Sequence, residues 1–272
     1  MDTQGRVLVT GASRGIGRAV ALELASRGFS VTATMRDPMA GVGLPEGMDV
    51  ARLDVTDQAS IVLPDGLRVL VNNAGVDGEN LSLEDTSLEE WRRQFETNVF
   101  GLVEVTRRAV PLMRAAGGGV IVNFTSSSLL APMPFYSVYR ASKAAVQALS
   151  ESLRTEVAPF GIHVMEVLPG PVDTDMLTAS KVPSDARGTP PYRDMAERVE
   201  QLREGESPTS VREAAAVVAD AICADPPPLR LGCDPLGAAL LSGWATTPDE
   251  EWVTSFRTVF APDLTRPART NI

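Results

Sequence analysis

The sequence predicts an α/β fold in which a doubly wound parallel sheet carries helices on both faces. Short apolar segments alternate with longer segments of helical periodicity, and this order is typical of a parallel sheet. A glycine-rich turn separates the first apolar segment from the first helical one. The chain has 272 residues and 44% hydrophobic content, which suits one large domain or two small ones. We expect a single domain over residues 1–272.

Each predicted strand is a short apolar run that ends at a turn or at a polar residue. The strand segments are 6–10, 30–34, 50–53, 69–71, 120–124 and 162–168. The third and fourth strands are separated by about a dozen residues, which is near the minimum for a parallel crossover. We therefore expect a short or missing helix between Asp54 and Arg68.

The helical segments repeat apolar residues on one face. A first helix begins at the glycine turn and ends at Gly28, and a long helix carrying Tyr139 and Lys143 ends near Gly161. Another helical region presents the apolar face Leu88, Trp91, Phe95 and Val99. We expect this face to belong to the core.

The turn after the first strand is suited to hold a phosphate. It contains Gly11, Ser13, Arg14, Gly15, Ile16 and Gly17. A glycine-rich turn at a helix start directs backbone N–H groups and the positive end of the helix at an anion. A second strand follows at the distance found in dinucleotide-binding folds, so we predict a Rossmann-type cofactor site. A tight turn without a ligand is the alternative.

The end of the second strand favours NADP(H) over NAD(H). An acidic residue at this place would bind the ribose hydroxyls and repel a 2′-phosphate. The chain has Met35 and then Arg36 here, with Arg14 in the glycine turn. Two guanidiniums near one corner favour a phosphate, although Asp37 adjoins them and Arg36 could be an ordinary surface arginine.

Tyr139 and Lys143 form the candidate catalytic pair. Positions i and i+4 share one face of a helix, and Lys143 is one of only two lysines in the chain. An ammonium beside a phenol favours the phenolate, so we expect the pKa of Tyr139 to be lowered. A phenol shifted in this way can transfer protons near neutral pH.

Composition excludes several other functions. The net charge is −10 and there is no basic stretch, so nucleic acids and anionic membrane surfaces are poor partners. No segment is long and apolar enough to cross a membrane, and a strand that begins near Arg6 leaves no room for a signal peptide. We expect a cytoplasmic protein. Cys223 and Cys233 lack a metal-ligand pattern, and no metal site is predicted.

Taken together, these motifs resemble the short-chain dehydrogenase/reductase family over roughly residues 5 to 175. The motifs are the turn from Thr10 to Gly17, Asp54, the Asn-Asn-Ala-Gly run from Asn72, Asn98, Ser126, Tyr139, Lys143, and the Pro-Gly-x-Val-x-Thr stretch from Pro169 to Thr174. The resemblance implies hydride transfer between nicotinamide and a ketone or secondary alcohol.

The resemblance also implies roles for particular residues. Ser126 and Tyr139 would hold the reacting oxygen, Lys143 would assist, and Asn98 would hold a water that links Lys143 to solvent. Ser127 and Ser128 adjoin Ser126, which leaves the register of the serine open. The implied cofactor-binding residues, besides those of the glycine turn and Arg36, are Asp54, Val55, Asn73, Ala74, Gly75, Tyr139, Lys143, Pro169, Gly170, Val172 and Thr174.

The remaining third of the chain suggests the substrate. Residues 227–231 and 252–254 resemble the 17-beta-hydroxysteroid dehydrogenase-like branch of the family. We expect a substrate lid around 175–208, a C-terminal extension around 234–272, and an apolar pocket wall from Met133, Phe135 and Tyr136. The expected substrate is a bulky apolar or polycyclic carbonyl compound.

Alternative functions remain open from the residues alone. One is a tailoring ketoreductase of a natural-product pathway, and another is a non-catalytic NADP-binding sensor or regulatory protein. The family resemblance further implies assembly through the two long helices around Asn98 and Tyr139, as a homodimer or homotetramer.

Overall fold

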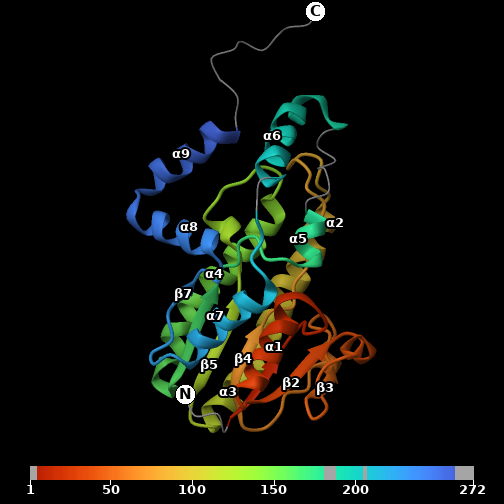
Figure 1. Ribbon diagram of the computed structural model, residues 1–272, viewed down its shortest axis with the longest axis vertical. Coiled ribbons are helices and arrows are strands. Elements are labelled where there is room, and N and C mark those ends of the chain that lie inside the picture. Colours follow the sequence, from red (N-terminus) through yellow and green to blue (C-terminus); the bar gives the residue numbers. More distant parts are fainter. Residues whose placement is uncertain (1–4, 181–187, 205–206, 261–272) are drawn as a thin grey trace, which may run out of the picture.

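Seven strands form one parallel sheet, as Figure 1 shows. The computed structural model describes residues 5–180, 188–204 and 207–260. The strand order is β3-β2-β1-β4-β5-β6-β7. The strands are β1 (Arg6–Val9), β2 (Ser30–Met35), β3 (Asp49–Arg52), β4 (Leu67–Asn72), β5 (Gly119–Phe124), β6 (Ile162–Val167) and β7 (Arg230–Leu231). The order reverses between β1 and β4, which confirms the predicted doubly wound, Rossmann-type fold.

Helices connect the strands and extend beyond the sheet. They are α1 (Gly15–Ser26), α2 (Leu88–Phe95), α3 (Leu102–Ala115), α4 (Ser137–Val157), α5 (Asp175–Ser180), α6 (Arg193–Glu204), α7 (Val211–Cys223), α8 (Pro235–Thr246) and α9 (Asp249–Phe260). Several begin at side-chain caps. For example, Ser210 and Glu213 form a capping box at the start of α7.

The sheet buries both of its faces. Alternate residues of β1 point to opposite sides, so Val7 and Val9 pack in one cluster with α1 and α7, whereas Leu8 packs in the other with α3. Strands buried on two faces read as continuous apolar runs rather than as alternating ones. The helices therefore cover both faces, as the sequence predicted.

The sheet edges show where the sequence was less informative. The connection from β3 to β4 contains only a 3₁₀ turn at Gln58–Ser60, which confirms the expected loss of a crossover helix. At the other edge, the two-residue strand β7 was not predicted. It pairs with Glu166 and Val167 of β6, and a strand this short has no readable periodicity.

The prediction that α2 buries its apolar face in the core is wrong. Leu88 is 68% exposed, and Trp91 and Phe95 are half-buried. The residue of α2 that is buried is the polar Gln94. Helical periodicity identifies an apolar face but not what covers it, and here the face is only partly covered.

The later helices lie beyond one end of the sheet. Figure 1 shows α6, α8 and α9 together at that end, above the loops that follow the strands. Parts of the predicted lid and extension (181–187, 205–206 and 261–272) are outside the described residues. No helix within the described ranges is long and apolar enough to cross a membrane.

Candidate active site

A pocket of about 410 Å³ lies where the carboxyl ends of the strands meet the later helices. Most of the residues named from the sequence line it. They are Gly11, Ser13, Arg14, Gly15, Ile16, Arg36, Asp54, Val55, Asn73, Ala74, Gly75, Ser126, Tyr139, Lys143, Pro169, Gly170, Val172 and Thr174. Gly17 and Asn98 lie behind this wall and are not part of the lining.

The glycine turn presents an uncapped helix start to the pocket. Gly11 and Gly15 have φ angles of +67° and +58°, which favour glycine. The N-cap residue of α1, Arg14, makes no side-chain cap, so within the described residues the first N–H groups of the helix have no side-chain acceptor. A Cβ on Gly17 would lie 2.2 Å from the Asn73 side chain, so Gly17 permits close packing. This cradle fits the phosphates of a dinucleotide.

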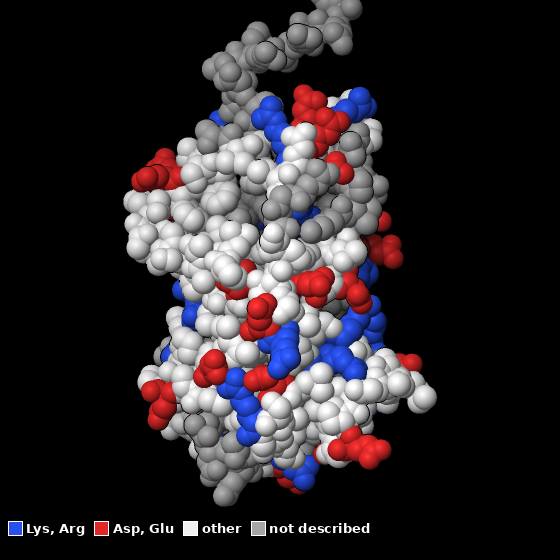
Figure 2. All heavy atoms as spheres, viewed as in Figure 1, with Lys and Arg blue, Asp and Glu red and all other residues white. Residues whose placement is uncertain are grey.

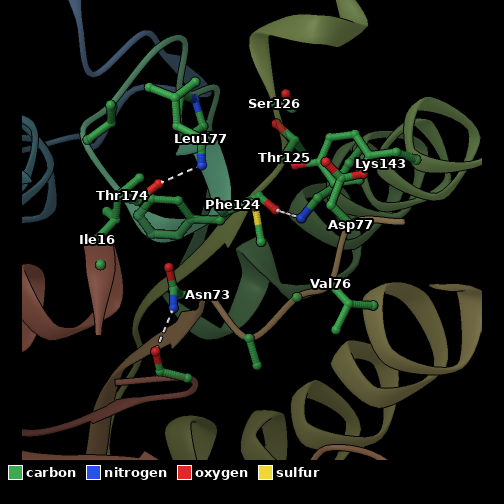
Figure 3. Close-up of a pocket in the computed structure, with 18 of the residues that line it drawn as sticks. Ile16, Asn73, Val76, Asp77, Phe124, Thr125, Ser126, Lys143, Thr174 and Leu177 are labelled. Atoms are coloured by element: carbon green, nitrogen blue, oxygen red, sulfur yellow. Dashed lines mark hydrogen bonds between the residues drawn. The ribbon is translucent and has the colours of Figure 1, made fainter. Parts of the chain in front are cut away.

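Asn73 fastens the glycine turn to the end of β4. Its side-chain amide donates to the carbonyls of Thr10 and Gly11 at 3.0 and 3.1 Å. The Thr10 hydroxyl in turn accepts the N–H groups of Asn73 and Ala74. Figure 3 shows the Asn73 amide engaged in this way, so its side chain is used to hold the turn in place.

The far end of the pocket carries opposite charges. Arg36 is exposed and lines the pocket beside Asp54. Partial burial acts to raise the pKa of Asp54, but hydrogen bonds from Thr56 and the charges of Arg36 and Arg52 lower it overall. Figure 2 shows basic side chains gathered over the region of α1 and β2. Arg14 is already paired with Asp175 at 3.2 Å, with both side chains exposed.

Ser126, Tyr139 and Lys143 meet at the other end of the pocket. The Ser126 side chain hydrogen-bonds Tyr139, which favours Ser126 over the adjoining serines as the candidate. Lys143 is 6% exposed, and its Nζ donates to the Phe124 carbonyl at 2.8 Å (Figure 3). The same Nζ lies 5.6 Å from the centre of the Tyr139 ring. One hydroxyl, one phenol and one amine thus share a small volume.

The expected lowering of the Tyr139 pKa is wrong for the protein without cofactor. Burial raises the pKa of the phenol above its ordinary value, and the charge of Asp77 adds to this, although the Ser126 hydrogen bond acts the other way. Burial also lowers the pKa of Lys143 to about 8, against the charge of Asp77. Spacing on a helix places two groups together, but only tertiary packing determines how much water they lose. The phenol is therefore protonated at neutral pH.

The buried Lys143 makes fold stability depend on pH. The amine titrates near 10.5 in the unfolded chain and at about 8 in the folded one, so the unfolded state binds more protons between these values. Burial of the lysine therefore destabilises the folded state to its full extent below about pH 8. This destabilisation disappears as the pH rises towards 10.5. We expect the stability of Lys143→Met relative to wild type to be higher at neutral pH than near pH 10. The difference in free energy of unfolding between the two proteins should change by up to about 3 kcal/mol between these pH values.

Urea unfolding of both proteins across that range measures this difference. The lost hydrogen bond to Phe124 adds a constant offset, and Tyr139 is present in both proteins, so its titration cancels. A stability difference that does not vary with pH would contradict a lysine buried in this way.

Asn98 lies in a π-helical segment between α2 and α3. The segment, η3, spans Glu96–Gly101. The Asn98 side chain exchanges hydrogen bonds with the backbone of Val76 at 2.8 and 2.9 Å and donates to Ser142 at 3.0 Å. Single-turn π segments frequently occur at functional sites. Here the widened turn directs the Asn98 side chain towards the loop after β4. The hydrophobic periodicity of the sequence did not indicate a π segment.

The loop after β6 is held by a residue that sequence reasoning missed. Asp234 accepts the N–H of Gly170 at 2.5 Å and also caps α8 through Gly237 at 2.9 Å. Val172 pairs with Thr209 in an isolated parallel bridge. Thr174 lines the pocket and accepts the N–H of Leu177 at 3.2 Å. The Asp-Pro dipeptide at 234–235 is a helix-start signal that could have marked Asp234.

Three further charged residues that line the pocket, Asp77, Asp175 and Arg203, were not named as site residues from the sequence. Asp77 follows the Asn-Asn-Ala-Gly run by two residues and lines the pocket, as does Arg203 of α6. The position of Asp77 just beyond a strand end was a usable signal. Arg203 falls in the predicted lid region 175–208, but nothing in the sequence singled it out, because α6 reaches the pocket only through the tertiary fold.

Comparisons with known proteins agree with this geometry. Residues 5–184 match the family model of short chain dehydrogenases. An uncharacterized oxidoreductase of Bacillus subtilis, YusZ, is 39% identical over 201 residues, which cover 65% of this chain and 70% of that protein. The 3-ketodihydrosphingosine reductase of Bacteroides thetaiotaomicron is 32% identical over 246 residues, covering 87% and 90%. A short chain dehydrogenase from Burkholderia cenocepacia, solved in complex with NADP, superimposes with a TM-score of 0.75 at 26% identity and covers 94% of this chain and 98% of that one.

Proposed function

The chain belongs to the short-chain dehydrogenase family and is an oxidoreductase of CH–OH and C=O groups, and from this premise we propose an NADP-dependent reductase of bulky apolar ketones. The observation that carries the proposal is the contact of Ser126 with Tyr139 beside the buried Lys143, at the end of a pocket that begins at an uncapped helix start. The 17-beta-hydroxysteroid dehydrogenase-like branch remains our proposal for its place within the family.

The proposed chemistry assigns one task to each side chain. Bound nicotinamide supplies or accepts the hydride. As the carbonyl oxygen gains negative charge, the hydroxyls of Ser126 and Tyr139 donate hydrogen bonds to it, and Tyr139 delivers the proton. The raised pKa of Tyr139 keeps the phenol protonated, which is the form that reduction requires. Lys143 would hold the ribose, and Asn98 would position the water that leads to solvent.

The preference for NADP rests on Arg36. It lines the pocket at the end of β2, is exposed, and follows Met35 where NAD-binding folds carry an acid. Arg14 is the second basic side chain at this corner, and its pair with Asp175 is an exposed one, which is worth little and can be exchanged for a phosphate. The NADP complex of the Burkholderia relative is consistent with this choice.

The proposal of an apolar substrate is based on the apolar residues of the pocket lining. Met133, Tyr136, Leu236 and Leu240 line the pocket, and so do Met176 and Leu177 of α5. The prediction that Phe135 belongs to the pocket wall is wrong, because this residue is not in the lining and packs with α6 and α9 in a separate apolar cluster. We propose that the described parts of the region 175–208 act as a lid and that α8, whose Leu236 and Leu240 line the pocket, belongs to a C-terminal extension of the same single domain. The relative named for 3-ketodihydrosphingosine reduction supports a large ketone substrate.

The test is consumption of NADPH, followed by its absorbance, with a panel of steroid, aromatic and polyketide-like ketones. Consumption with one class supports the reductase and identifies the substrate family. A natural-product tailoring ketoreductase has the same residues and would differ by responding only to the polyketide-like class. NADPH that binds tightly but is not consumed with any ketone would favour a non-catalytic sensor.

We also propose that the chain assembles through α2, η3 and α4. Leu88 and Phe100 are 68% and 58% exposed, and the rings of Trp91 and Phe95 stack beside them at 6.1 Å. We expect Phe100→Asp to lower the oligomeric state, because a carboxylate buried in an interface loses hydration without a partner. Light scattering coupled to size exclusion measures this. Val62→Asp is the matched control, since Val62 is 74% exposed on the loop before β4. An unchanged mass for Phe100→Asp would exclude this face.

A further inference from the structure

Asp77 places a carboxylate in the part of the pocket where the reaction is proposed to occur. It lines the pocket, and its charge acts on both Tyr139 and Lys143. Figure 3 shows Asp77 beside Lys143, on the side of the pocket opposite to Thr174 and Leu177. The proposed chemistry gives this acid no task, because Ser126, Tyr139 and Lys143 already supply the hydrogen bonds and the proton.

The other acids of the described pocket lining lie elsewhere. Asp54 is close to Arg36, and Asp175 is paired with Arg14, so both belong to the phosphate end. The charges of Lys143 and Arg203 also act on Asp77, and they lower its pKa against the larger opposite effect of burial. Lys143 donates to Phe124 at 2.8 Å, and the guanidinium of Arg203 lies over the Tyr136 ring at 5.2 Å.

The position of Asp77 is held firmly by its neighbours. Asn98 bonds both backbone groups of Val76, and Arg93 donates to the Asp77 carbonyl at 2.7 Å. Arg93 is itself fixed by two bonds to Glu90 at 2.7 Å. A Cβ on Gly78 would lie 1.8 Å from Glu90, so the loop is pressed against α2. The side chain therefore leaves a rigid backbone.

The carboxylate has an unused acceptor. One oxygen accepts the N–H of Gly78 at 2.8 Å, and within the part of the chain that the structure describes no donor reaches the other oxygen. An apolar ligand that filled the pocket would cut this oxygen off from water without replacing the lost hydrogen bond, which costs free energy. A ligand that carries its own donor would avoid this cost.

We propose that Asp77 is a specificity residue that accepts a hydrogen bond from a hydroxyl or ammonium group of the substrate close to the reacting carbonyl. The substrate is then a ketone with an apolar body and a polar donor next to its C=O group. This inference rests on the proposed reductase function and narrows its substrate class.

Three aryl ketones of nearly equal size test the proposal. They are 2-hydroxyacetophenone, 2-aminoacetophenone and propiophenone, which carry a hydroxyl, an ammonium or a methyl group at the same carbon. Their intrinsic reactivities differ, so the informative quantity is the change in the ratio of kcat/KM values between wild type and variant. That change cancels the intrinsic chemistry.

We expect Asp77→Leu to lower the hydroxyl-to-methyl and ammonium-to-methyl ratios by about ten- to a hundredfold, while turnover of propiophenone is largely retained. Asp77→Asn keeps a neutral acceptor, so it should retain much of the hydroxyl preference and lose most of the ammonium preference. Glu79→Gln, which removes an exposed charge two residues away, should leave both ratios unchanged.

Other outcomes would overturn the proposal. Unchanged ratios in Asp77→Leu mean that the carboxylate does not meet the substrate. An equal fall for all three ketones means that it acts on Tyr139 and Lys143, or through Arg203, and not on specificity. Thermal unfolding and NADPH binding verify that each variant folds. If Asp77→Leu does not fold, the ratios measured for Asp77→Asn test the proposal.

Failure of the reductase function would be recognised separately. If wild type reduces none of the three ketones, calorimetric binding of the same compounds to the NADP-loaded protein still measures the contribution of Asp77. A donor preference in binding that Asp77→Leu removes supports the inference without turnover. Equal binding of all three compounds to wild type overturns it.

Discussion

Replacing Tyr139 by phenylalanine is expected to abolish turnover while NADPH binding persists. The variant loses only the hydroxyl that hydrogen-bonds Ser126 and would deliver the proton. General acid catalysis of this kind is worth about a hundredfold to ten-thousandfold in rate. The ring remains to pack beneath Lys143, whose Nζ lies 5.6 Å from its centre. The two measurements are kcat/KM for a reduced ketone and the dissociation constant of NADPH.

Tyr192→Phe is the matched control for this variant. Tyr192 lies in the 3₁₀ turn Pro190–Tyr192, within the proposed lid, but its side chain is not in the pocket lining, so loss of its hydroxyl should leave turnover largely intact. Turnover near the wild-type rate in Tyr139→Phe would remove this residue from the mechanism. Loss of NADPH binding in the same variant would instead point to a damaged pocket.

The second large effect is expected at the opposite end of the pocket, where Arg36→Asp should reverse the preference for NADPH over NADH. Losing a charged hydrogen bond to the 2′-phosphate costs about 1.5–3 kcal/mol, or roughly ten- to a hundredfold in affinity. The new carboxylate also repels the phosphate and can accept the ribose hydroxyls of NAD. The measurement is the ratio of kcat/KM values for the two cofactors with one ketone.

Arg52→Asp is the control that distinguishes a direct contact of Arg36 with the 2′-phosphate from a general change of charge. Arg52 lies at the end of β3, is paired with Asp57 at 3.0 Å and also lowers the pKa of Asp54, yet it does not line the pocket. We expect its substitution to change the cofactor ratio little. Equal effects of the two variants would mean that Arg36 acts only through the local potential, and an unchanged ratio in Arg36→Asp would show that Arg36 does not meet the phosphate.

Local patterns were sufficient to predict the sheet and the candidate residues. The named strands other than β3, which lies exposed at the sheet edge, belong to the buried core and appear as mostly apolar runs, which a parallel sheet requires. The glycine turn, Ser126, Tyr139 and Lys143 were recognisable because each follows a strand or lies on one helix at a fixed spacing. The missing helix after Asp54 followed from segment length alone.

Patterns were insufficient wherever burial or long-range contacts decide the outcome. The α2 face looked like core, but Leu88 is 68% exposed. The residue pattern of the π segment around Asn98 does not differ from that of an α-helix, so only its hydrogen bonds identify it. Arg203 reaches the pocket from a distant part of the chain, and Asp234, equally remote, holds the pocket residue Gly170 through a hydrogen bond.

The sequence by itself determined the fold class and the chemical groups of the site, because periodicity and spacing along the chain dictate which side chains share a strand end or a helix face. Only the tertiary structure decided the state of those groups. Burial reversed the expected shift of the Tyr139 pKa, and docking of the loop after β4 onto α2 placed Asp77 in the pocket. Solvation and charge depend on everything packed around a group, and that environment comes from residues remote in sequence.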